Sequence, residues 1–413
     1  MSLNATPRSN RLHVGVFGRR NSGKSSLINA ITGHDTAIVS EHAGTTTDPV
    51  YKSMEIHPIG PCLLIDTAGF DDDGEIGSLR VERTREAANK TDIALVVFSQ
   101  DVVAKDIAKT SDITQASDME LEKKWIDEFK EKNIPVIAVL NKSDLKGNTS
   151  AACDHIDRST GIRPIVVSAR EKTGIEQVFS ELIRSLPEDF DSLSITGGIV
   201  EDGDTVMLVM PQDIQAPKGR LILPQVQTLR ELLDRKCLVL CVGADKLDEA
   251  IKALATPPAV IITDSQYFRS VYEKKPKQCK LTSFSVLFAG YKGNVEYFAQ
   301  SAAAIDMLRE DSRVLIAEAC THAPLSEDIG RVKIPALLRK RIGQKLHIDI
   351  VSGTDFPEDL TSYDLVIHCG ACMFNRKYVL SRVERACEQK VPMTNYGVAI
   401  AYLSGILDKI NLS

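Results

Sequence analysis

The sequence Gly18-Arg19-Arg20-Asn21-Ser22-Gly23-Lys24-Ser25 lies between a short β-rich run, residues 12–17, and a run of helical character, residues 26–31. A strand, the pattern G-x-x-x-x-G-K-S and a helix, in this order, predict a phosphate-binding loop. Its glycines let backbone N–H groups curl around phosphates, while Lys24 reaches the β- and γ-phosphates and the Ser25 hydroxyl ligates Mg²⁺. The stretch therefore predicts a nucleotide-binding α/β domain and leaves ATP and GTP open.

The choice of base depends on two segments further along the chain. Asn141-Lys142-Ser143-Asp144 follows a buried-strand run, residues 134–140. The Asp144 carboxylate can accept from both N1–H and the 2-amino group of guanine, and a buried carboxylate left unpaired by adenine would be costly. Ser168-Ala169-Arg170 follows a second strand-like run and is expected to contact the guanine O6 through its backbone. These segments predict GTP.

The magnesium and γ-phosphate side is supplied by two more segments. Asp66-Thr67-Ala68-Gly69 provides a Mg²⁺-side carboxylate and a γ-phosphate-sensing glycine, and Gly44-Thr45-Thr46-Thr47-Asp48 provides a switch threonine. Five motifs in this order resemble the translation-factor-like GTPases. Phe70 stands where many GTPases place the glutamine that orients water, so hydrolysis is expected to be slow.

Asn21, together with Gly44-Thr45-Thr46, resembles the potassium-activated GTPases of the tRNA-modification (MnmE/TrmE-like) branch. The resemblance implies that the Asn21 amide oxygen and switch-I carbonyls hold K⁺, a hard cation suited to oxygen ligands, and that K⁺ stimulates hydrolysis. The alternative is that Asn21 is a plain loop residue. The expected catalytic residues are Lys24, Thr46, Asp66 and Gly69, with Ser25, Thr46 and Asp66 at Mg²⁺ and Asn21 at K⁺. The expected nucleotide contacts are Gly18, Asn21, Ser22, Gly23, Lys24, Ser25, Ser26, Thr45, Thr46, Asp66, Gly69, Asn141, Lys142, Asp144, Ser168 and Ala169.

Length and composition limit the class of protein. A chain of 413 residues is too long for one core, and 43% hydrophobic with 26% charged residues is ordinary for a globular protein. A net charge of −6 argues against general nucleic-acid binding. There is no apolar secretory run at residues 1–7 and no membrane-length apolar segment, and nine cysteines suit a reducing compartment. We expect a cytoplasmic protein without nucleic-acid or membrane partners.

The fold expected is α/β throughout: a P-loop GTPase domain with a doubly wound sheet over residues 1–186, then two smaller α/β domains over 187–278 and 279–413. Short β runs alternate with helical runs in both later regions. Because the middle region shows no catalytic constellation, we expect it to mediate dimerisation. Cys237 and Cys241 have the same parity in an apolar run, so both are expected in the core.

The last region carries two clusters of metal-ligand type, Cys320-Thr321-His322 and His368-Cys369-Gly370-Ala371-Cys372. Each follows a predicted strand, residues 313–319 and 364–367, so both are expected at the carboxyl edge of a parallel sheet. Three interpretations stay open: unliganded thiols, a Cys₃His zinc site, or a [4Fe–4S] cluster with one iron on a weaker ligand. The candidates for that weaker ligand are His322, His368, Glu327, Asp328 and water.

The Asn-containing P-loop, the α/β middle region and the pattern Cys-x-His…His-Cys-x-x-Cys resemble the HydF family, the [FeFe]-hydrogenase maturation GTPases. The resemblance covers the whole chain and implies a [4Fe–4S] cluster on Cys320, Cys369 and Cys372. It also implies a scaffold, dimeric or larger through its middle domain, that receives a transient diiron subcluster built by two radical-SAM maturases and passes it to the apo-hydrogenase. His322 and His368 are either ligands or contacts to the diiron unit. The alternative function is a zinc-stabilised regulatory GTPase acting on RNA or the ribosome.

Overall fold

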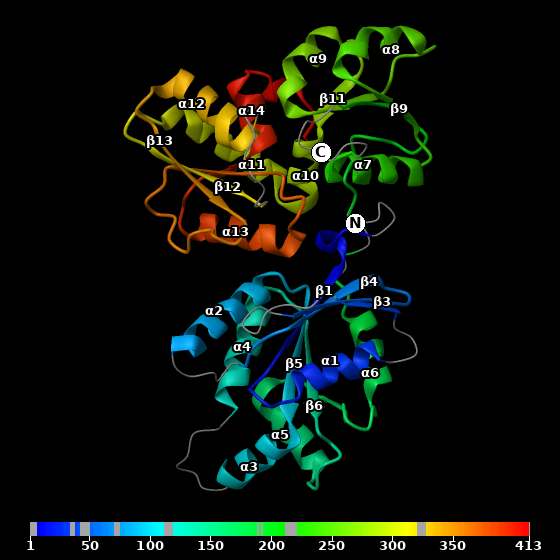
Figure 1. Ribbon diagram of the computed structural model, residues 1–413, viewed down its shortest axis with the longest axis vertical. Coiled ribbons are helices and arrows are strands. Elements are labelled where there is room, and N and C mark those ends of the chain that lie inside the picture. The colour runs from blue at the N-terminus through cyan, green and yellow to red at the C-terminus, as the bar shows by residue number, and fades with distance from the viewer. Residues whose placement is uncertain are drawn as a thin grey trace. The chain divides into compact units, whose positions relative to one another are not determined.

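The computed structural model describes residues 6–33, 38–41, 50–69, 75–110, 119–187, 190, 193–210, 221–319 and 328–412. The chain divides into two compact units, Met1–Asp191 and Ser192–Ser413, and each is described by itself (Figure 1). None of the helices in the described part of the chain is both long and apolar enough to span a bilayer.

A seven-stranded sheet forms the centre of the first unit, with the strand order β2-β3-β4-β1-β5-β6-β7. At one side of the sheet β3 pairs antiparallel with both β2 and β4, and the remaining pairs are parallel. All six residues of β1 are buried, as expected for a central parallel strand covered on both faces. The strands are β1 (Leu12–Phe17), β2 (Ile38–Glu41), β3 (Val50–Ile56), β4 (Gly60–Asp66), β5 (Ile93–Ser99), β6 (Val136–Asn141) and β7 (Ile165–Val166).

Helices cover both faces of this sheet. One core contains residues of α1 and α6, and the opposite core contains residues of α2, α3, α4 and α5, including Trp125. The rings of Phe17, Trp125 and Phe129 pack together within the second core, so Trp125 is a core residue. The helices are α1 (Lys24–Thr32), α2 (Glu75–Asn89), α3 (Gln100–Thr110), α4 (Glu120–Glu131), α5 (Thr149–Thr160) and α6 (Ile175–Arg184).

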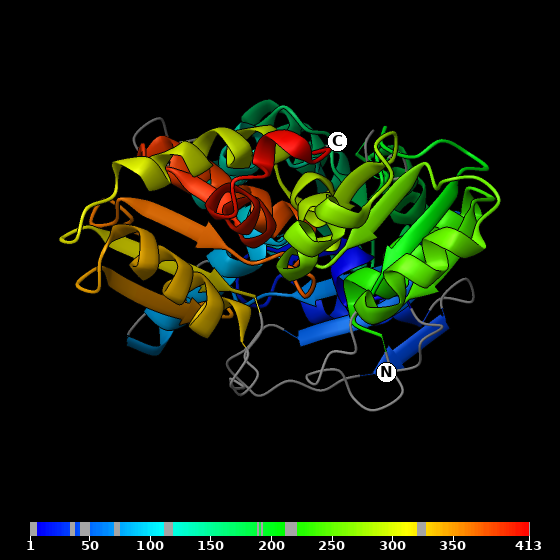
Figure 2. The same ribbon diagram turned by 90° about the horizontal axis from the view of Figure 1, so that it is seen from above.

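Two four-stranded sheets, each parallel throughout, form the second unit, and Figure 2 shows them in green and in gold to orange. Their strand orders are β11-β10-β8-β9 and β13-β12-β14-β15. The first contains β8 (Thr205–Val209), β9 (Leu238–Val242), β10 (Val260–Thr263) and β11 (Lys280–Ser283); the second contains β12 (Arg313–Glu318), β13 (His347–Ser352), β14 (Leu365–His368) and β15 (Met393–Asn395). The helices are α7 (Leu223–Asp234), α8 (Leu247–Ala253), α9 (Phe268–Lys274), α10 (Phe284–Lys292), α11 (Val295–Ser301), α12 (Ile334–Ile342), α13 (Arg376–Glu388) and α14 (Tyr396–Leu403).

A single hydrophobic cluster joins the two sheets of the second unit. It contains Met207 and Ile261 of one sheet together with Leu315 and Val366 of the other. The two regions expected to be separate domains therefore share a core in one compact unit. Strand β11 pairs with β10, so the first of these sheets also extends past the boundary expected at residue 279. The prediction of a P-loop α/β domain followed by further α/β regions is confirmed.

The expectation that Cys237 and Cys241 both lie in the core is wrong for one of them. Cys237 is 6% exposed, whereas Cys241 is exposed. Cys237 precedes β9, and Cys241 lies within that strand, which is at the edge of its sheet and has β8 as its described neighbour. The regular alternation of buried and exposed side chains, on which the expectation depended, therefore does not extend from Cys237 before the strand to Cys241 within it.

Candidate functional site

The phosphate-binding loop connects β1 to α1 and depends on two glycines with positive φ angles, Gly18 at 148° and Gly23 at 91°. A Cβ on Gly23 would lie 2.3 Å from Asn141 Nδ2, and one on Gly18 would lie 2.5 Å from the Val97 carbonyl oxygen. Side chains rarely adopt such φ angles, and neither position has room for one. The loop is thus a backbone surface, as cradling of phosphates requires.

Lys24 is the first residue of α1, and its side chain folds back over the loop. Its Nζ donates to the carbonyl oxygen of Gly18 at 3.0 Å and to that of Arg19 at 2.8 Å. The residue is only 8% exposed. The ammonium group is therefore held at the loop, where it can bind the β- and γ-phosphates as the motif predicts.

The magnesium side of the site contains two buried polar atoms without hydrogen-bond partners in the described part of the chain, Asp66 Oδ1 and Ser22 Oγ. Asp66 ends β4, and burial raises the pKa of its carboxyl group, while a hydrogen bond from Ser25 and the charge of Lys24 lower it. One oxygen of the buried Asp66 carboxylate thus has no donor, and the Ser25 hydroxyl lies next to the same group. Together they fit a Mg²⁺ ligand set. The Thr67 hydroxyl donates to the Val16 carbonyl at 2.7 Å and fixes the start of the following segment.

Asn141 connects the phosphate side to the guanine side. Its Nδ2 donates to the Ser22 carbonyl at 3.1 Å, and its Oδ1 accepts from the Ala169 N–H at 3.1 Å. The Ser168 hydroxyl donates to Asp144 Oδ1 at 2.6 Å and lowers the pKa of that carboxyl group. The carboxylate is thus ionised and oriented, which is the state that accepts two hydrogen bonds from guanine.

Two ion pairs beside the nucleotide site were missed by the sequence analysis. Arg19 Nε lies 2.7 Å from Oε1 of Glu122, a residue of α4 that is 3% exposed. Lys142 Nζ lies 3.1 Å from Asp101 Oδ1 at the start of α3. The sequence carries one signal for the first pair, because Glu122 is a charged residue on the apolar side of an amphipathic helix.

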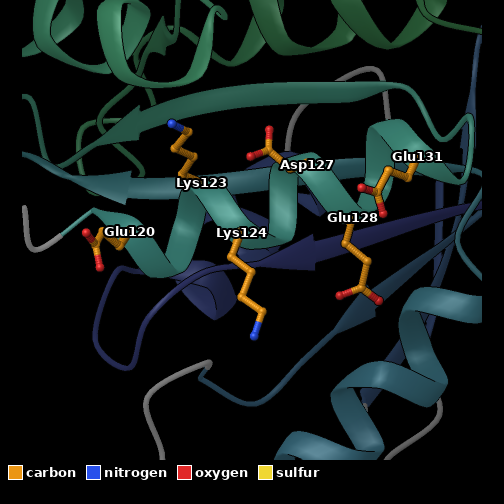
Figure 3. Close-up of a pocket in the computed structure, with 6 residues that line it drawn as sticks. All are labelled: Glu120, Lys123, Lys124, Asp127, Glu128 and Glu131. Carbon is orange, nitrogen blue, oxygen red and sulfur yellow. The ribbon is translucent and has the colours of Figure 1, made fainter.

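The opposite side of α4 borders a surface hollow that is lined by residues of that helix alone (Figure 3). Its lining residues are Glu120, Lys123, Lys124, Asp127, Glu128 and Glu131. Charges of both signs from one helix, with none of the nucleotide motifs among them, are typical of a solvated helix face. We assign no site there.

Several predicted site residues lie outside the described residues, and for them the sequence prediction stands as it was. They are Thr45, Thr46 and Phe70 in the first unit, and Cys320, His322 and Glu327 in the second. Within the described part of the chain, no three side chains of the types His, Cys, Asp and Glu lie together as a metal site. The candidate metal centre is therefore described through Cys369, Cys372 and their surroundings.

The Cys369-Gly370-Ala371-Cys372 segment follows β14 at the carboxyl edge of its sheet. Cys369 Sγ lies 3.0 Å from the backbone N of Ala319, at the end of the neighbouring β12, and 3.4 Å from that of Ala371. Ala371 has a φ of 51°, in the left-handed region that residues other than glycine rarely adopt. Backbone donors stabilise a thiolate, the form in which cysteine binds metals. Since Ala319 immediately precedes Cys320, the contact agrees with the convergence predicted from the sequence.

His368 is 1% exposed, and both of its ring nitrogens have partners. Arg382 Nη1 lies 3.0 Å from Nε2, and the Cys369 carbonyl oxygen lies 2.8 Å from Nδ1. An arginine can only donate, so Nε2 accepts and the ring proton sits on Nδ1, from which it is donated to Cys369. Burial, and then the charge of Arg382, lowers the pKa of His368 to about 3. A ligand role for His368 would require the loss of one of these contacts.

Glu318, the last residue of β12, is 7% exposed and paired with Arg331 at 2.9 Å. Asp328, one of the candidate weaker ligands, is 4% exposed, and its Oδ1 accepts from the Arg331 N–H at 2.8 Å. Asp328 thus serves as a helix cap in the described structure, while Glu318 and Arg331 join the two chain segments that border residues 320–327.

Comparison with protein families gives three matches along the chain. Family models described as the hydrogen maturase F dimerization domain and tetramerization domain match residues 195–293 and 296–411. A model described as a 50S ribosome-binding GTPase matches residues 13–142. The first unit is therefore a GTPase domain, which implies GTP and Mg²⁺.

The curated relatives are GTPases and match less than half of the chain. The tRNA modification GTPase MnmE of Endomicrobium trichonymphae is 36% identical over 177 residues, which are 42% of this chain and 35% of that protein. GTPase Der of Wolinella succinogenes is 37% identical over 139 residues, or 33% of this chain and 26% of that protein. The match thus spans only about a third of the length of the MnmE relatives. The GTPase part is MnmE-like.

Two solved structures align with part of the chain at low similarity. An Aquifex aeolicus Era variant bound to GDP and AlF4⁻ aligns with 56% of this chain and 92% of its own, at 18% identity and a TM-score of 0.33. A probable GTP-binding protein engB aligns with 42% of this chain and 98% of its own, at 19% identity and a TM-score of 0.31.

Proposed function

The chain belongs to the hydrogen maturase F family, and on this premise we propose that it is a GTP-hydrolysing scaffold that holds a [4Fe–4S] cluster. The scaffold would receive the diiron subcluster of the [FeFe]-hydrogenase active site from two radical-SAM maturases and transfer it to the apo-hydrogenase. The observation that carries the proposal is the pair of backbone donors at Cys369 Sγ, one of them from the residue that precedes Cys320.

The cluster would be held by Cys320, Cys369 and Cys372, and three thiolates leave one iron for a weaker ligand. We propose His322 or Glu327 for that position. His368 is less suited, because its two ring nitrogens are engaged by Arg382 and by the Cys369 carbonyl. Bound there, the cluster would supply an exchangeable iron position at which a second iron unit can attach. The protein's own part is to keep the thiolates ionised and fixed.

GTP would act as a switch and not as a reagent for the cluster, because the P-loop residues and the cysteine motif belong to separate compact units. Lys24, Ser25 and Asp66 would bind the phosphates and Mg²⁺, with Thr46 and Gly69 sensing the γ-phosphate. Asn21, which has a φ of 62° in the loop, would hold K⁺ through its amide oxygen. Equal hydrolysis rates in KCl and NaCl would remove the role proposed for Asn21.

The middle region would form a homodimer, and the last region would extend it to a tetramer, in line with the family descriptions. Support comes from β9, an edge strand of its sheet, whose first residue Leu238 is 67% exposed. Leu233, near the end of the helix α7 that precedes β9 in the sequence, is 56% exposed. Apolar side chains on an open strand edge suit pairing with a second copy. Leu238→Lys should halve the mass measured by light scattering, whereas an unchanged mass would exclude this edge.

The test of the scaffold is anaerobic purification with metal analysis and EPR of the reduced protein. We expect iron and sulfide in the ratio of a [4Fe–4S] cluster, and near-complete loss of both in Cys369→Ser and Cys372→Ser. Cys387→Ser is the matched control, because Cys387 is an exposed cysteine of α13 outside the motif. Zinc without iron in the wild-type protein would overturn the proposal.

A further inference from the structure

Arg382 of α13 is a buried arginine beside the candidate metal centre, outside its cysteine motif. The residue is 2% exposed, and its guanidinium carbon lies 4.6 Å from the ring centres of Phe356 and Phe374 and 4.7 Å from that of Tyr378. Phe374 belongs to the chain segment that directly follows Cys372. The three rings exclude water from the guanidinium and leave its charge unscreened.

The hydrogen bonds of Arg382 go to neutral groups. Nη1 donates to His368 Nε2 at 3.0 Å, and Nη2 donates to the Gly353 carbonyl oxygen at 2.6 Å and to the Tyr378 hydroxyl at 3.3 Å. Nε is buried without a hydrogen-bond partner. Among the described residues, no carboxylate pairs with this arginine. A buried arginine normally has such a partner, because an uncompensated charge in the interior is costly.

The metal centre would supply the charge that compensates Arg382. Arg382 is connected to the proposed ligand Cys369 by two contacts: its Nη1 lies 3.0 Å from His368 Nε2, and His368 Nδ1 lies 2.8 Å from the Cys369 carbonyl oxygen. A [4Fe–4S] cluster on three thiolates carries a net negative charge, and reduction adds one more electron. A fixed cation near such a cluster stabilises the reduced form and raises the reduction potential.

We propose that Arg382 is the buried counter-charge of the iron–sulfur cluster and a positioning residue for its ligand Cys369. The inference rests on the proposed function. The positioning runs through His368: Arg382 donates to Nε2, which keeps the ring proton on Nδ1, and Nδ1–H in turn holds the Cys369 carbonyl oxygen. Asn395 Nδ2 supports the same oxygen at 3.4 Å. The peptide that presents the thiolate is thus fixed from outside the motif.

A purely structural role would assign Arg382 to filling the space between the three rings. A methionine has a similar length and favourable contacts with aromatic rings, so it would fill that space without a charge. A lysine would keep the charge and lose the planar set of donors. The two substitutions therefore separate charge from packing and from hydrogen bonding.

The experiment is a mediated potentiometric titration of the full-length protein with its reconstituted cluster, followed by EPR, for wild type, Arg382→Met and Arg382→Lys. We expect Arg382→Met to lower the equilibrium constant for cluster reduction about tenfold, which is a shift of about 59 mV to a more negative potential for one electron. Arg382→Lys should stay close to wild type in potential, with an altered EPR line shape because the contact with His368 is lost. Iron and sulfide content is measured for each variant.

Arg385→Met is the matched control. Arg385 lies on the same helix, is partly buried, donates to the Pro357 carbonyl at 3.2 Å and lies 5.9 Å from the Phe356 ring centre. Its replacement should leave the potential unchanged. An unshifted potential in Arg382→Met, or the same shift in all three variants, would overturn the inference and leave the scaffold intact. If Arg382→Met fails to retain iron, Arg382→Lys provides the test. A shift of about 59 mV in the reduction potential of Arg382→Lys would then overturn the inference. Absence of iron in the wild-type protein would count against the scaffold itself.

Discussion

The two candidate sites of this chain are built in opposite ways. The nucleotide site takes most of its geometry from one loop, in which two glycines with positive φ, a lysine and backbone amides follow one another between β1 and α1. The metal centre has its predicted ligands at two strand ends, and the groups that fix Cys369 come from β12, α13 and β15. A local motif thus specifies the phosphate-binding part of the first site, whereas the second site depends on the packing of a whole unit.

Lys24→Ala tests this difference with the largest expected effect. Loss of a positioned charge at the phosphates should reduce the GTP hydrolysis rate by about 10²–10³-fold, as for a donor that stabilises transition-state charge. Because the cysteine motif lies in the other compact unit, iron content should stay at the wild-type level. The measurements are phosphate release and iron analysis on the same preparation. Loss of iron in this variant would contradict the separation of the two sites.

Asn141→Ala should weaken GTP binding by about 10–100-fold. Asn141 is 2% exposed and connects the P-loop, through the Ser22 carbonyl, to the guanine loop, through the Ala169 N–H. Removing it leaves buried backbone groups unsatisfied, at about 1–3 kcal/mol. The dissociation constant of a fluorescent GTP analogue provides the measurement. An unchanged constant would mean that each loop holds its position alone, and that this site is even more local than described.

The extent to which the sequence predicted each site follows from the same difference. The strand of residues 12–17 and the glycine loop were predicted because their pattern is local, and the structure places β1 at those residues. The contact between Ala319 and Cys369 agrees with the predicted convergence, because strand order in a parallel sheet brings carboxyl ends together. Arg382 and Glu122 were not predicted: the place of Glu122 on the apolar side of its helix indicates a buried charge, but nothing near either residue in the sequence indicates its distant partner. The shared core that joins the two last regions was missed for the same reason.

Glu122→Gln should lower the free energy of unfolding of the first unit by about 1–3 kcal/mol. The substitution leaves Arg19, which is partly buried, without its carboxylate partner. Glu128→Gln is the matched control on the same helix, because its pair with Lys132 is far less buried than Glu122 and should contribute under about 1 kcal/mol. Thermal unfolding of each variant, with and without GTP, measures the two losses of stability. Equal effects would mean that the P-loop needs no support from α4, which would make the nucleotide site wholly local.

Thiol reactivity separates the core cysteines Cys62 and Cys279 from the candidate ligand Cys369 with the smallest perturbation. Burial raises the pKa of Cys62 to about 12 and that of Cys279 to about 11, so both stay protonated at pH 8. Since only the thiolate reacts, iodoacetamide should label these two thiols slowly and faster only as the pH approaches those values. Cys369, whose sulfur receives two backbone N–H groups, should be labelled earlier in the iron-free protein and be protected once the cluster is reconstituted. Peptide mass spectrometry over a pH series gives each rate. If Cys62 were labelled as fast as Cys369 at pH 8, the distinction between core thiols and a prepared ligand would be lost.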